Sequence, residues 1–359
     1  MYRKKLVSLC LIFTVAACVP QNQPVVEVEP TLTPFQPLQN TPTSLPTVTP
    51  TTTSTPVPPA ATAIPLPAVA EEYLPYTIAS LRARSYGGGQ IETLEVIEEK
   101  ENFTRYEIHY PSDGLDIYGF VNVPKGDGPF PVIIMMHGYG WSKVPTVLSS
   151  DTPVADLLAE HGFVVLHPNM RGYPPSDDGD DRYRVGLAVD ILNLIALVKE
   201  QARQPGLLEN VDPARLGLWG HSLGGGVALR VATVSEDIKA MVLYSSISAD
   251  DLKNAKLFYA ITEEQKYLTE IETPPEVMAY ISPLNYFDTI NASVKLYHSL
   301  TDDVVPSAWA TETCDAMKEN NVDIDCFYYI GADHTFSSDF QADFRKTMLA
   351  FFEAHLKEP

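Results

Sequence analysis

A serine between two glycines is the first group whose type and spacing could do chemistry. Gly220, Ser222 and Gly224 form a Gly-x-Ser-x-Gly motif. The apolar residues 216–219 before it predict a buried strand, and residues 227–232 after it predict a helix. A strand that turns at once into a helix strains its apex residue and leaves no room for a Cβ on either side, which explains the glycines. The motif therefore predicts a nucleophilic serine exposed above a sheet.

A serine hydroxyl needs a base, and that base needs a carboxylate to orient it. Residues 295–298 and 327–330 predict two further strands, which are followed by Asp302 and Asp303 and by His334, respectively. The carboxyl ends of parallel strands meet at one edge of a sheet, so these groups are expected to lie near Ser222. We predict that His334 is the general base and that Asp302 orients it, with Asp303 as the competitor.

Two backbone N–H groups are candidates for binding the oxyanion. Leu223 begins the helix after the serine, and Tyr139 follows the fully apolar residues 132–136. N–H groups at such positions point to where negative charge develops during acyl transfer. His137, at the same strand end, is interpreted as a residue that holds the loop and not as a base. This chemistry needs no metal and no organic cofactor.

An acidic loop raises the alternative of a metal site. It contains Asp177, Asp178, Asp180 and Asp181. Their order lacks the regular ligand spacing of a calcium-binding loop. The pattern therefore favours a solvated acidic loop without a metal.

Alternating apolar strands and amphipathic helices predict an α/β fold with a mostly parallel sheet and helices on both faces. Residues 103–110 and 115–123 read as a hairpin, 163–167 and 240–244 as strands, and 153–161, 185–200 and 338–356 as helices, the second amphipathic. The first helix would be capped by Asp151 or Thr152. Residues 71–100 suggest a small element at the domain edge. Residues 248–281 predict a helical cap with four exposed aromatic side chains: Phe258, Tyr259, Tyr267 and Tyr280.

The N-terminus has the pattern of an export signal. Basic residues 3–5 precede the apolar residues 6–17, which are too few to span a bilayer. Small residues stand just before Cys18, an arrangement that resembles the lipobox of bacterial lipoproteins. The resemblance implies removal of the signal peptide 1–17 and lipidation of Cys18; an ordinary signal peptide is the alternative. Either way we predict an exported protein, and lipidation would anchor it at a bacterial cell envelope.

Composition divides the rest of the chain. Residues 18–70 are rich in Pro and Thr and predict a disordered linker, whereas 71–359 suit one catalytic domain. The net charge of −21 argues against nucleic-acid binding and leaves the lipid as the only membrane contact. Cys314 and Cys326 lack metal-ligand spacing; a disulfide and two buried thiols are both compatible with the sequence. The oligomeric state is left open.

The order Ser222, Asp302, His334 is that of α/β hydrolases. Within that fold the chain resembles the catalytic domain of the prolyl oligopeptidase family over roughly residues 75 to 357. The shared segments are 112–114, 117–119, 137–138, 171–172, 211–217 with the serine turn, 302–306 and 333–334. The family's acid is the first aspartate of an Asp-x-x-Val motif, which falls on Asp302 and not on Asp303.

The resemblance implies a serine peptidase that cleaves short peptides through an acyl-enzyme. Three features depart from the family. Only about thirty folded residues precede the hairpin, so there is no β-propeller; no paired-glutamate motif is present; and the turn reads His221-Ser222-Leu223, as in esterases and lipases. The missing propeller and the serine turn favour the alternative of a carboxylesterase, for example one that deacylates polysaccharides. A non-catalytic binding module is the third hypothesis.

Overall fold

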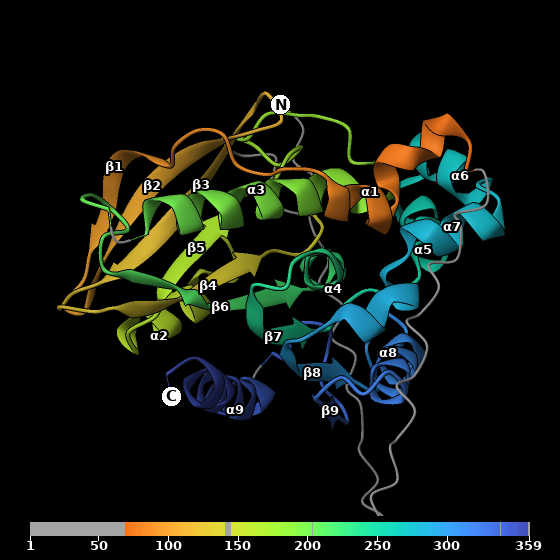
Figure 1. Ribbon diagram of the computed structural model, residues 1–359. Helices are drawn as coiled ribbons and strands as arrows, with labels where there is room; N and C mark the ends of the chain where they lie inside the picture. Colours follow the sequence, from red (N-terminus) through yellow and green to blue (C-terminus); the bar gives the residue numbers. More distant parts are fainter. Residues whose placement is uncertain (1–68, 141–144, 203, 338, 358–359) are drawn as a thin grey trace, which may run out of the picture. The chain divides into compact units, whose positions relative to one another are not determined.

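A computed structural model describes residues 69–140, 145–202, 204–337 and 339–357 (Figure 1). The predicted signal peptide 1–17, the lipidation site Cys18 and nearly all of the linker lie outside these residues. The described residues all belong to a compact unit spanning residues 65–359. Among the described helices, none is both long and apolar enough to cross a membrane.

Nine strands of the described residues form one sheet in the order β1-β2-β3-β5-β4-β6-β7-β8-β9. The strands are β1 (Glu92–Glu99), β2 (Phe103–Ser112), β3 (Leu115–Pro124), β4 (Phe130–Met136), β5 (Val164–Pro168), β6 (Val211–His221), β7 (Ile238–Tyr244), β8 (Ser293–Ser299) and β9 (Ile324–Tyr329). Pairing is antiparallel from β1 to β5 along this order and parallel from β5 to β9. The mostly parallel sheet, the predicted hairpin and the α/β-hydrolase fold are confirmed.

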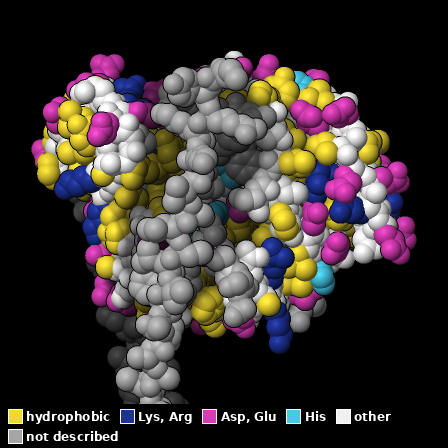
Figure 2. Space-filling view, turned by 180° about the vertical axis from the view of Figure 1, so that it is seen from behind, with side chains coloured by type: hydrophobic (Ala, Val, Ile, Leu, Met, Phe, Trp, Pro, Cys, Tyr) yellow, Lys and Arg dark blue, Asp and Glu magenta, His cyan; other side chains and the backbone are white. Residues whose placement is uncertain are grey.

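Helices cover both faces of the sheet (Figure 1). They are η1 (Glu71–Tyr76), α1 (Ile78–Ala83), α2 (Thr152–Glu160), η2 (Arg182–Arg184), α3 (Val185–Gln201), α4 (Leu223–Val234), α5 (Asp251–Thr262), α6 (Gln265–Ile271), α7 (Pro275–Ile281), η3 (Pro283–Thr289), α8 (Ser307–Glu319) and α9 (Asp339–Leu356). The core side chains of α3, α4 and α8 pack in one cluster, and those of α2 and α9 pack in a second cluster. On the face shown in Figure 2, acidic side chains are spread around the rim, in keeping with the net charge of −21.

Helix α3 is the first correction to the sequence prediction. It was expected to be amphipathic, yet it is buried on nearly all sides, including its polar residues Asp190 and Asn193. The segment before β1 crosses its outer side, where the N–H of Gly87 donates to Asn193 Oδ1 over 2.9 Å. A Cβ at Gly87 would lie 3.2 Å from the Cβ of Ala196, so the crossing is close. A helix covered in this way cannot show a clean polar face.

The N-terminal edge also contains a strand that the sequence did not predict. Strand β1 pairs with β2, but its side chains are mostly exposed and half of them are glutamates, which hides the apolar alternation of a strand. Before it, Ile78 and Leu81 of α1 are buried against Met278 and Ile281 of α7. The first described residues therefore brace the cap as well as the sheet edge.

Helices α5, α6 and α7 form the predicted cap between β7 and β8. Two of its aromatic side chains, Phe258 and Tyr267, are buried and not exposed as expected, because their rings stack on each other at 5.3 Å within the cap. Tyr259 and Tyr280 are half-buried. The cap is therefore a packed unit with its own aromatic interior.

Four buried charges fasten this cap to the sheet domain. Arg184, just before α3, contacts Asp251 at 3.0 Å and Glu270 at 2.8 Å, and Arg230 of α4 also pairs with Asp251. Each side chain is at most 6 % exposed. Buried charges are tolerated only when each finds a partner, so loss of one would leave an uncompensated charge. The network ties α5 and α6 to α3 and α4.

Candidate active site

Ser222 lies at the turn between β6 and α4. Its backbone has φ 52° and ψ −113°, a strained conformation for a residue with a side chain. A Cβ at Gly224 would overlap the carbonyl oxygen of Met136, and one at Gly220 would overlap that of Gly224. The N–H of Ser222 donates to Tyr244 O over 2.9 Å, which helps to hold the turn. The glycines are therefore required by close backbone approach, as the motif predicts.

His334 and Asp302 are joined by a short hydrogen bond. His334 Nδ1 lies 2.8 Å from Asp302 Oδ2, whose side chain is fully buried. The other oxygen of Asp302 accepts from the N–H groups of Val304 and Val305, both over 2.8 Å. Burial raises the pKa of Asp302, but the hydrogen bonds from His334 and Val305 outweigh it and lower the pKa below its ordinary value. Asp303, the competitor, is exposed.

The structure brings the predicted residues to one edge of the sheet. Ser222 follows β6, Asp302 follows β8 and His334 follows β9, and these strands run parallel. The ring of His334 lies 5.4 Å from that of His221, the residue before the serine. A Cβ at Gly138, in the loop after β4, would lie 3.4 Å from Ser222 Cβ, so this loop also contacts the serine.

Tyr139 and Leu223, the predicted oxyanion donors, both line a cleft of about 510 Å³, hereafter the cap cleft. The N–H of Leu223 is at the first position of α4, where it has no partner within the helix. The ring of Tyr139 packs 5.2 Å from that of Phe258 in the cap. Buried His137 contacts the carbonyls of Gly138 and Asn169 at 2.8 and 2.9 Å, which places it as a residue holding this loop.

The four aspartates of the acidic loop contact different groups. Asp177 and Asp178 accept from backbone N–H groups, Asp180 pairs with Arg182, and Asp181 pairs with Lys266 of the cap. Within the described part of the chain, no group of three or more His, Cys, Asp or Glu side chains could hold a metal ion. Of the four, Asp181 connects the loop to the cap through Lys266.

A second carboxylate–imidazole pair near the serine was missed at the sequence level. His221 Nδ1 lies 3.5 Å from Asp151 Oδ1, and both side chains are buried. Asp151 was predicted only as a helix cap; it occupies the N-cap position of α2, but its side chain makes no capping hydrogen bond. Its carboxylate is therefore free to face His221. The only sequence signal was a histidine directly before the nucleophile.

Buried His298 of β8 is a further residue that the motifs did not single out. Its Nε2 lies 3.1 Å from Val305 O and 3.5 Å from Asp302 Oδ2. Burial lowers the pKa of His298, which favours its neutral form. It braces the turn that carries Asp302.

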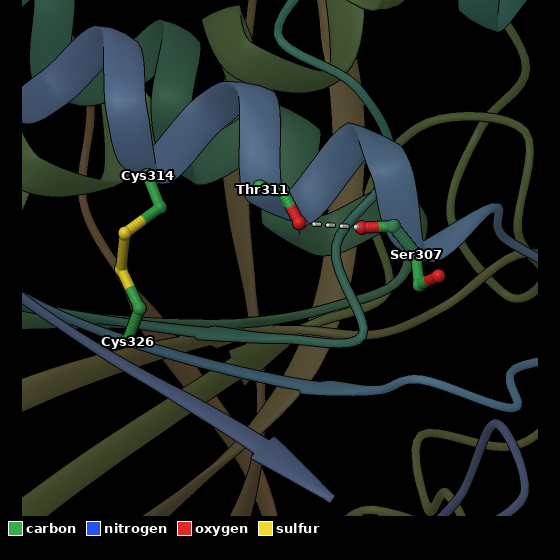
Figure 3. Close-up of a disulfide and its surroundings, with 4 residues drawn as sticks. All are labelled: Ser307, Thr311, Cys314 and Cys326. Carbon is green, nitrogen blue, oxygen red and sulfur yellow. Dashed lines mark hydrogen bonds between the residues drawn. A yellow bond between two sulfur atoms is a disulfide. The ribbon is translucent and has the colours of Figure 1, made fainter. Parts of the chain in front are cut away.

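Cys314 of α8 and Cys326 of β9 form a disulfide (Figure 3). Helix α8 begins just after the Asp302 turn, and β9 leads to His334. The disulfide therefore links the two segments that carry this pair. In α8, Thr311 Oγ1 also donates to Ser307 O over 3.4 Å, one turn before the disulfide.

Known structures share the fold at low sequence identity. Acetyl xylan esterase 1 from Thermoanaerobacterium sp. superposes with a TM-score of 0.56 at 20 % identity over 78 % of this chain and 93 % of its own. The acylaminoacyl peptidase of Pyrococcus horikoshii superposes with a TM-score of 0.60 at 22 % identity over 72 % of this chain but 43 % of its own. At this identity the likeness establishes the fold alone.

Sequence comparison identifies the family. Esterase EstD of Thermotoga maritima is 23 % identical over 47 % of this chain and 43 % of its own. An uncharacterized 31.7 kDa protein of Escherichia coli is 29 % identical over 40 % of this chain and 46 % of its own, so the chain spans under half of these two relatives. The model of the prolyl oligopeptidase family matches residues 149–359, more than half of the sequence, and the chain therefore belongs to the prolyl oligopeptidase family.

Proposed function

We propose that the protein is a serine hydrolase that cleaves acyl bonds through a covalent acyl-enzyme. The observation that carries the proposal is the 2.8 Å bond between His334 and buried Asp302, at the sheet edge where the strained turn presents Ser222. Family membership supports the same chemistry. A carboxylate, an imidazole and a hydroxyl in this arrangement are suited to nucleophilic acyl transfer.

The proposed reaction runs in two halves. Ser222 Oγ attacks the acyl carbonyl, and its proton passes to His334, which then gives it to the leaving oxygen or nitrogen. A water molecule attacks the acyl-enzyme, loses its proton to His334, and releases the acid as Ser222 Oγ regains that proton. Asp302 stays ionised and stabilises the imidazolium. The N–H groups of Leu223 and Tyr139 bind the oxyanion in each half.

Short peptides are the first candidate substrates, because family membership favours a peptidase. The cap cleft offers a surface for them. Aromatic side chains of Tyr139, Tyr173 and Tyr267 line it together with the charged side chains of Asp181 and Lys266. Aromatic surface beside charged groups of both signs suits a peptide, whose backbone and side chains are partly polar.

A carboxylesterase is the second candidate, and the length of the matching structures favours it. The acetyl xylan esterase matches this chain over 93 % of its own length, whereas the acylaminoacyl peptidase matches over 43 %. The described domain thus corresponds to nearly a whole esterase but to only part of a peptidase. Ester leaving groups are also better than amines, so the same three side chains can serve.

The decisive experiment compares peptide anilides with short-chain aryl esters, using the full chain and its Ser222→Ala variant. Anilide cleavage that disappears in the variant would support the peptidase. Ester cleavage alone, again lost in the variant, would support the esterase. Turnover equal to that of the Ser222→Ala variant on both substrate classes would contradict the proposed hydrolase.

We further propose that the protein is exported and lipid-anchored through Cys18 at a bacterial cell envelope. The basic residues 3–5, the apolar residues 6–17 and the small residues before Cys18 support this location. The Cys314–Cys326 disulfide also suits an oxidising compartment outside the cytoplasm. Metabolic labelling with a fatty acid should mark the wild-type protein and not its Cys18→Ala variant; equal labelling would contradict the anchor.

A further inference from the structure

A second pocket adjoins Ser222. It is lined by Gly138, Tyr139, Gly140, Leu148, Ser149, Ser150 and His221, has a volume of about 350 Å³, and is called the histidine pocket here. Tyr139 and Gly140 also line the cap cleft, so the two cavities meet at the loop that supplies the proposed oxyanion donor. The acyl transfer proposed for Ser222 does not require this pocket.

His221 lines this pocket with a nearly buried imidazole. Its side chain is 9 % exposed, and its buried Nε2 makes no hydrogen bond within the described residues. The ring stacks on Tyr244 with centroids 4.5 Å apart and an angle of 18° between the planes, which fixes its orientation. Its Nδ1 faces the Asp151 carboxylate, so the tautomer with the proton on Nδ1 is favoured and Nε2 is left as a lone-pair acceptor.

Asp151 is positioned to maintain that tautomer. Its side chain is buried, its own N–H is held by Ser149 Oγ over 3.0 Å, and its Oδ2 has no hydrogen-bond partner in the part of the chain that the structure describes. Burial raises the pKa of Asp151, but its interaction with His221 outweighs burial and lowers the pKa below the ordinary value. A buried carboxylate with spare acceptor capacity, next to an imidazole with a free acceptor, suits a ligand that donates hydrogen bonds.

The position of Ser222 indicates which part of a substrate enters this pocket. Its two neighbours in sequence face different cavities: His221 lines the histidine pocket, and Leu223 lines the cap cleft. A carbonyl attacked by Ser222 would therefore enter near the loop that the two cavities share. His334, which must reach the leaving group, has its ring 5.4 Å from that of His221. This distance favours the histidine pocket as the leaving-group side and the cap cleft as the acyl side.

We propose that His221 and Asp151 form a leaving-group subsite that accepts a hydrogen bond from an N–H or O–H group beside the scissile bond. The inference rests on the proposed function and specifies its substrates. A second hydroxyl on a polyol or sugar leaving group would supply the donor in an ester. The next amide N–H of the leaving amine would supply it in a peptide.

Matched substrates that differ in one donor test the proposal. Ser222-dependent hydrolysis of 4-nitrophenyl acetate is established first. The ester pair is then 2-hydroxyethyl acetate and 2-methoxyethyl acetate, and the peptide pair is alanylglycine N-methylamide and its N,N-dimethylamide. We expect kcat/KM to favour the donor by about tenfold or more in one pair at least, because the analogue without it leaves buried acceptors unpaired. The responding pair distinguishes an O–H from an N–H donor.

Variants assign the preference to the two residues. His221→Phe keeps an aromatic ring on Tyr244 but removes the acceptor, so the donor preference should fall to near one. His221→Gln retains an acceptor and should keep part of the preference. Asp151→Asn no longer imposes the tautomer and should lower the preference without changing side-chain volume. The matched control is His161→Gln, at an exposed histidine outside the site, which should keep the full preference.

Several results would overturn the proposal. The first is a wild-type ratio of kcat/KM, with and without the donor, near one in both substrate pairs. The second is a ratio that is unchanged in both His221→Phe and Asp151→Asn. The third is a preference for the donor seen only between ethyl hydroxyacetate and ethyl methoxyacetate, which differ in the acyl group. Thermal unfolding of each variant checks its fold, and if His221→Phe fails to fold, Asp151→Asn decides. Absence of Ser222-dependent hydrolysis of both 4-nitrophenyl acetate and the peptide anilides would instead contradict the proposed function itself, and this inference with it.

Discussion

Asp302 and His334 form one carboxylate–imidazole pair beside Ser222, and Asp151 and His221 form another. The first pair has a 2.8 Å hydrogen bond, and both oxygens of its carboxylate are bound. Among the described residues, the second has a 3.5 Å contact, one carboxylate oxygen without a partner, and an imidazole Nε2 without a partner. The carboxylate of the first pair is therefore saturated with hydrogen bonds, and that of the second pair is not.

This difference matches the proposed division between proton transfer and binding. A saturated carboxylate holds its imidazole in one orientation and stabilises the charge that appears when the imidazole takes a proton. An unsaturated pair keeps its hydrogen-bonding capacity for an incoming ligand. Residue type therefore does not distinguish the two roles, whereas the number of bonds that each carboxylate already makes does. Four predictions test or refine this comparison.

The largest effect is expected from replacing the two aspartates separately. Asp302→Asn should lower kcat by about 10³–10⁴-fold, because an amide cannot hold His334 in the tautomer that accepts the serine proton. Asp151→Asn should lower kcat/KM by about tenfold or less, and only for leaving groups with a donor. Steady-state kinetics of both variants on one ester and its donor-free analogue measure the contrast.

Asp303→Asn is the matched control for the first variant, since Asp303 is the exposed neighbour of Asp302. It should stay within about twofold of the wild type, as expected for a surface change away from the chemistry. Equal losses of kcat in Asp302→Asn and Asp151→Asn would contradict the division of roles between the pairs.

Histidines near Asp151 should make stability depend on pH. Burial, followed by the charge of neighbouring His137, lowers the pKa of His167 to about 4. In the unfolded chain it takes up a proton near its ordinary value of 6.5, so the unfolded state binds more protons between pH 6.5 and 4. The free energy of unfolding should therefore fall as the pH is lowered through this window, by up to about 3 kcal/mol from His167. Asp302, whose pKa is lowered, loses its stabilising effect only as the pH falls below its ordinary value of 3.8.

Urea unfolding at pH 7, 5.5 and 4 measures this dependence. In His167→Phe, which keeps a ring against Phe120, the free energy of unfolding should vary less with pH. The dependence is not abolished, because burial also lowers the pKa of His137. A variant whose unfolding free energy varies with pH as steeply as that of the wild type would show that His167 is not responsible.

The disulfide offers a smaller perturbation of the first pair alone. Cys314 and Cys326 are 12 residues apart, and releasing such a loop costs about 2–3 kcal/mol in the chain-entropy account. We expect Tm to fall by roughly 3–5 °C on reduction or in the Cys314→Ala, Cys326→Ala variant. At 25 °C the folded enzyme should keep kcat within about twofold, since β8 and β9 stay paired. The donor preference at His221 should not change; loss of that preference would mean that the two pairs are coupled.

The sequence predicted the first pair because it belongs to a pattern of strand ends. Ser222, Asp302 and His334 each follow an apolar strand, and the parallel sheet brings such ends together. The second pair follows no such pattern. Asp151 lies at a helix start, where a carboxylate is expected to cap, and only the structure shows that it makes no capping bond. Its approach to His221 is a tertiary contact between β6 and the loop before α2.

Elements were predicted best where the sequence carries a simple apolar pattern. The hairpin of β2 and β3 alternates in part between buried and more exposed side chains, and it was confirmed. Strand β4 is buried along nearly its whole length, so its continuous apolar run predicted it equally well. Strand β1 and helix α3 lack such a pattern for opposite reasons. Strand β1 is exposed and acidic, whereas helix α3 is covered on both sides. Burial of Phe258 and Tyr267 likewise depends on their contact with each other inside the cap. Periodicity reports a boundary with water, and these elements lack a simple one.

The smallest expected effect on kcat comes from His298, and it tests whether the Asp302–His334 pair depends on this neighbouring residue. Its Nε2–H donates to Val305 O, and the N–H of Val305 in turn donates to Asp302. His298→Phe removes the donor and loosens this turn, so kcat should fall by about tenfold while KM stays the same. His298→Gln keeps an N–H donor and should restore part of kcat.

Separate measurement of kcat and KM decides the role of His298, with thermal unfolding as the check on folding. A fall in kcat that Gln partly reverses identifies a positioning residue that acts through Asp302. A rise in KM at constant kcat would instead place the effect in substrate binding and contradict the assignment. In the second pair, His167 contacts Ser149 Oγ, which holds the N–H of Asp151, but Asp151 Oδ2 has no hydrogen-bond partner among the described residues. A large effect of His298→Phe would therefore support the view that saturation of the carboxylate, and not the pairing alone, suits the first pair to its proposed role in proton transfer.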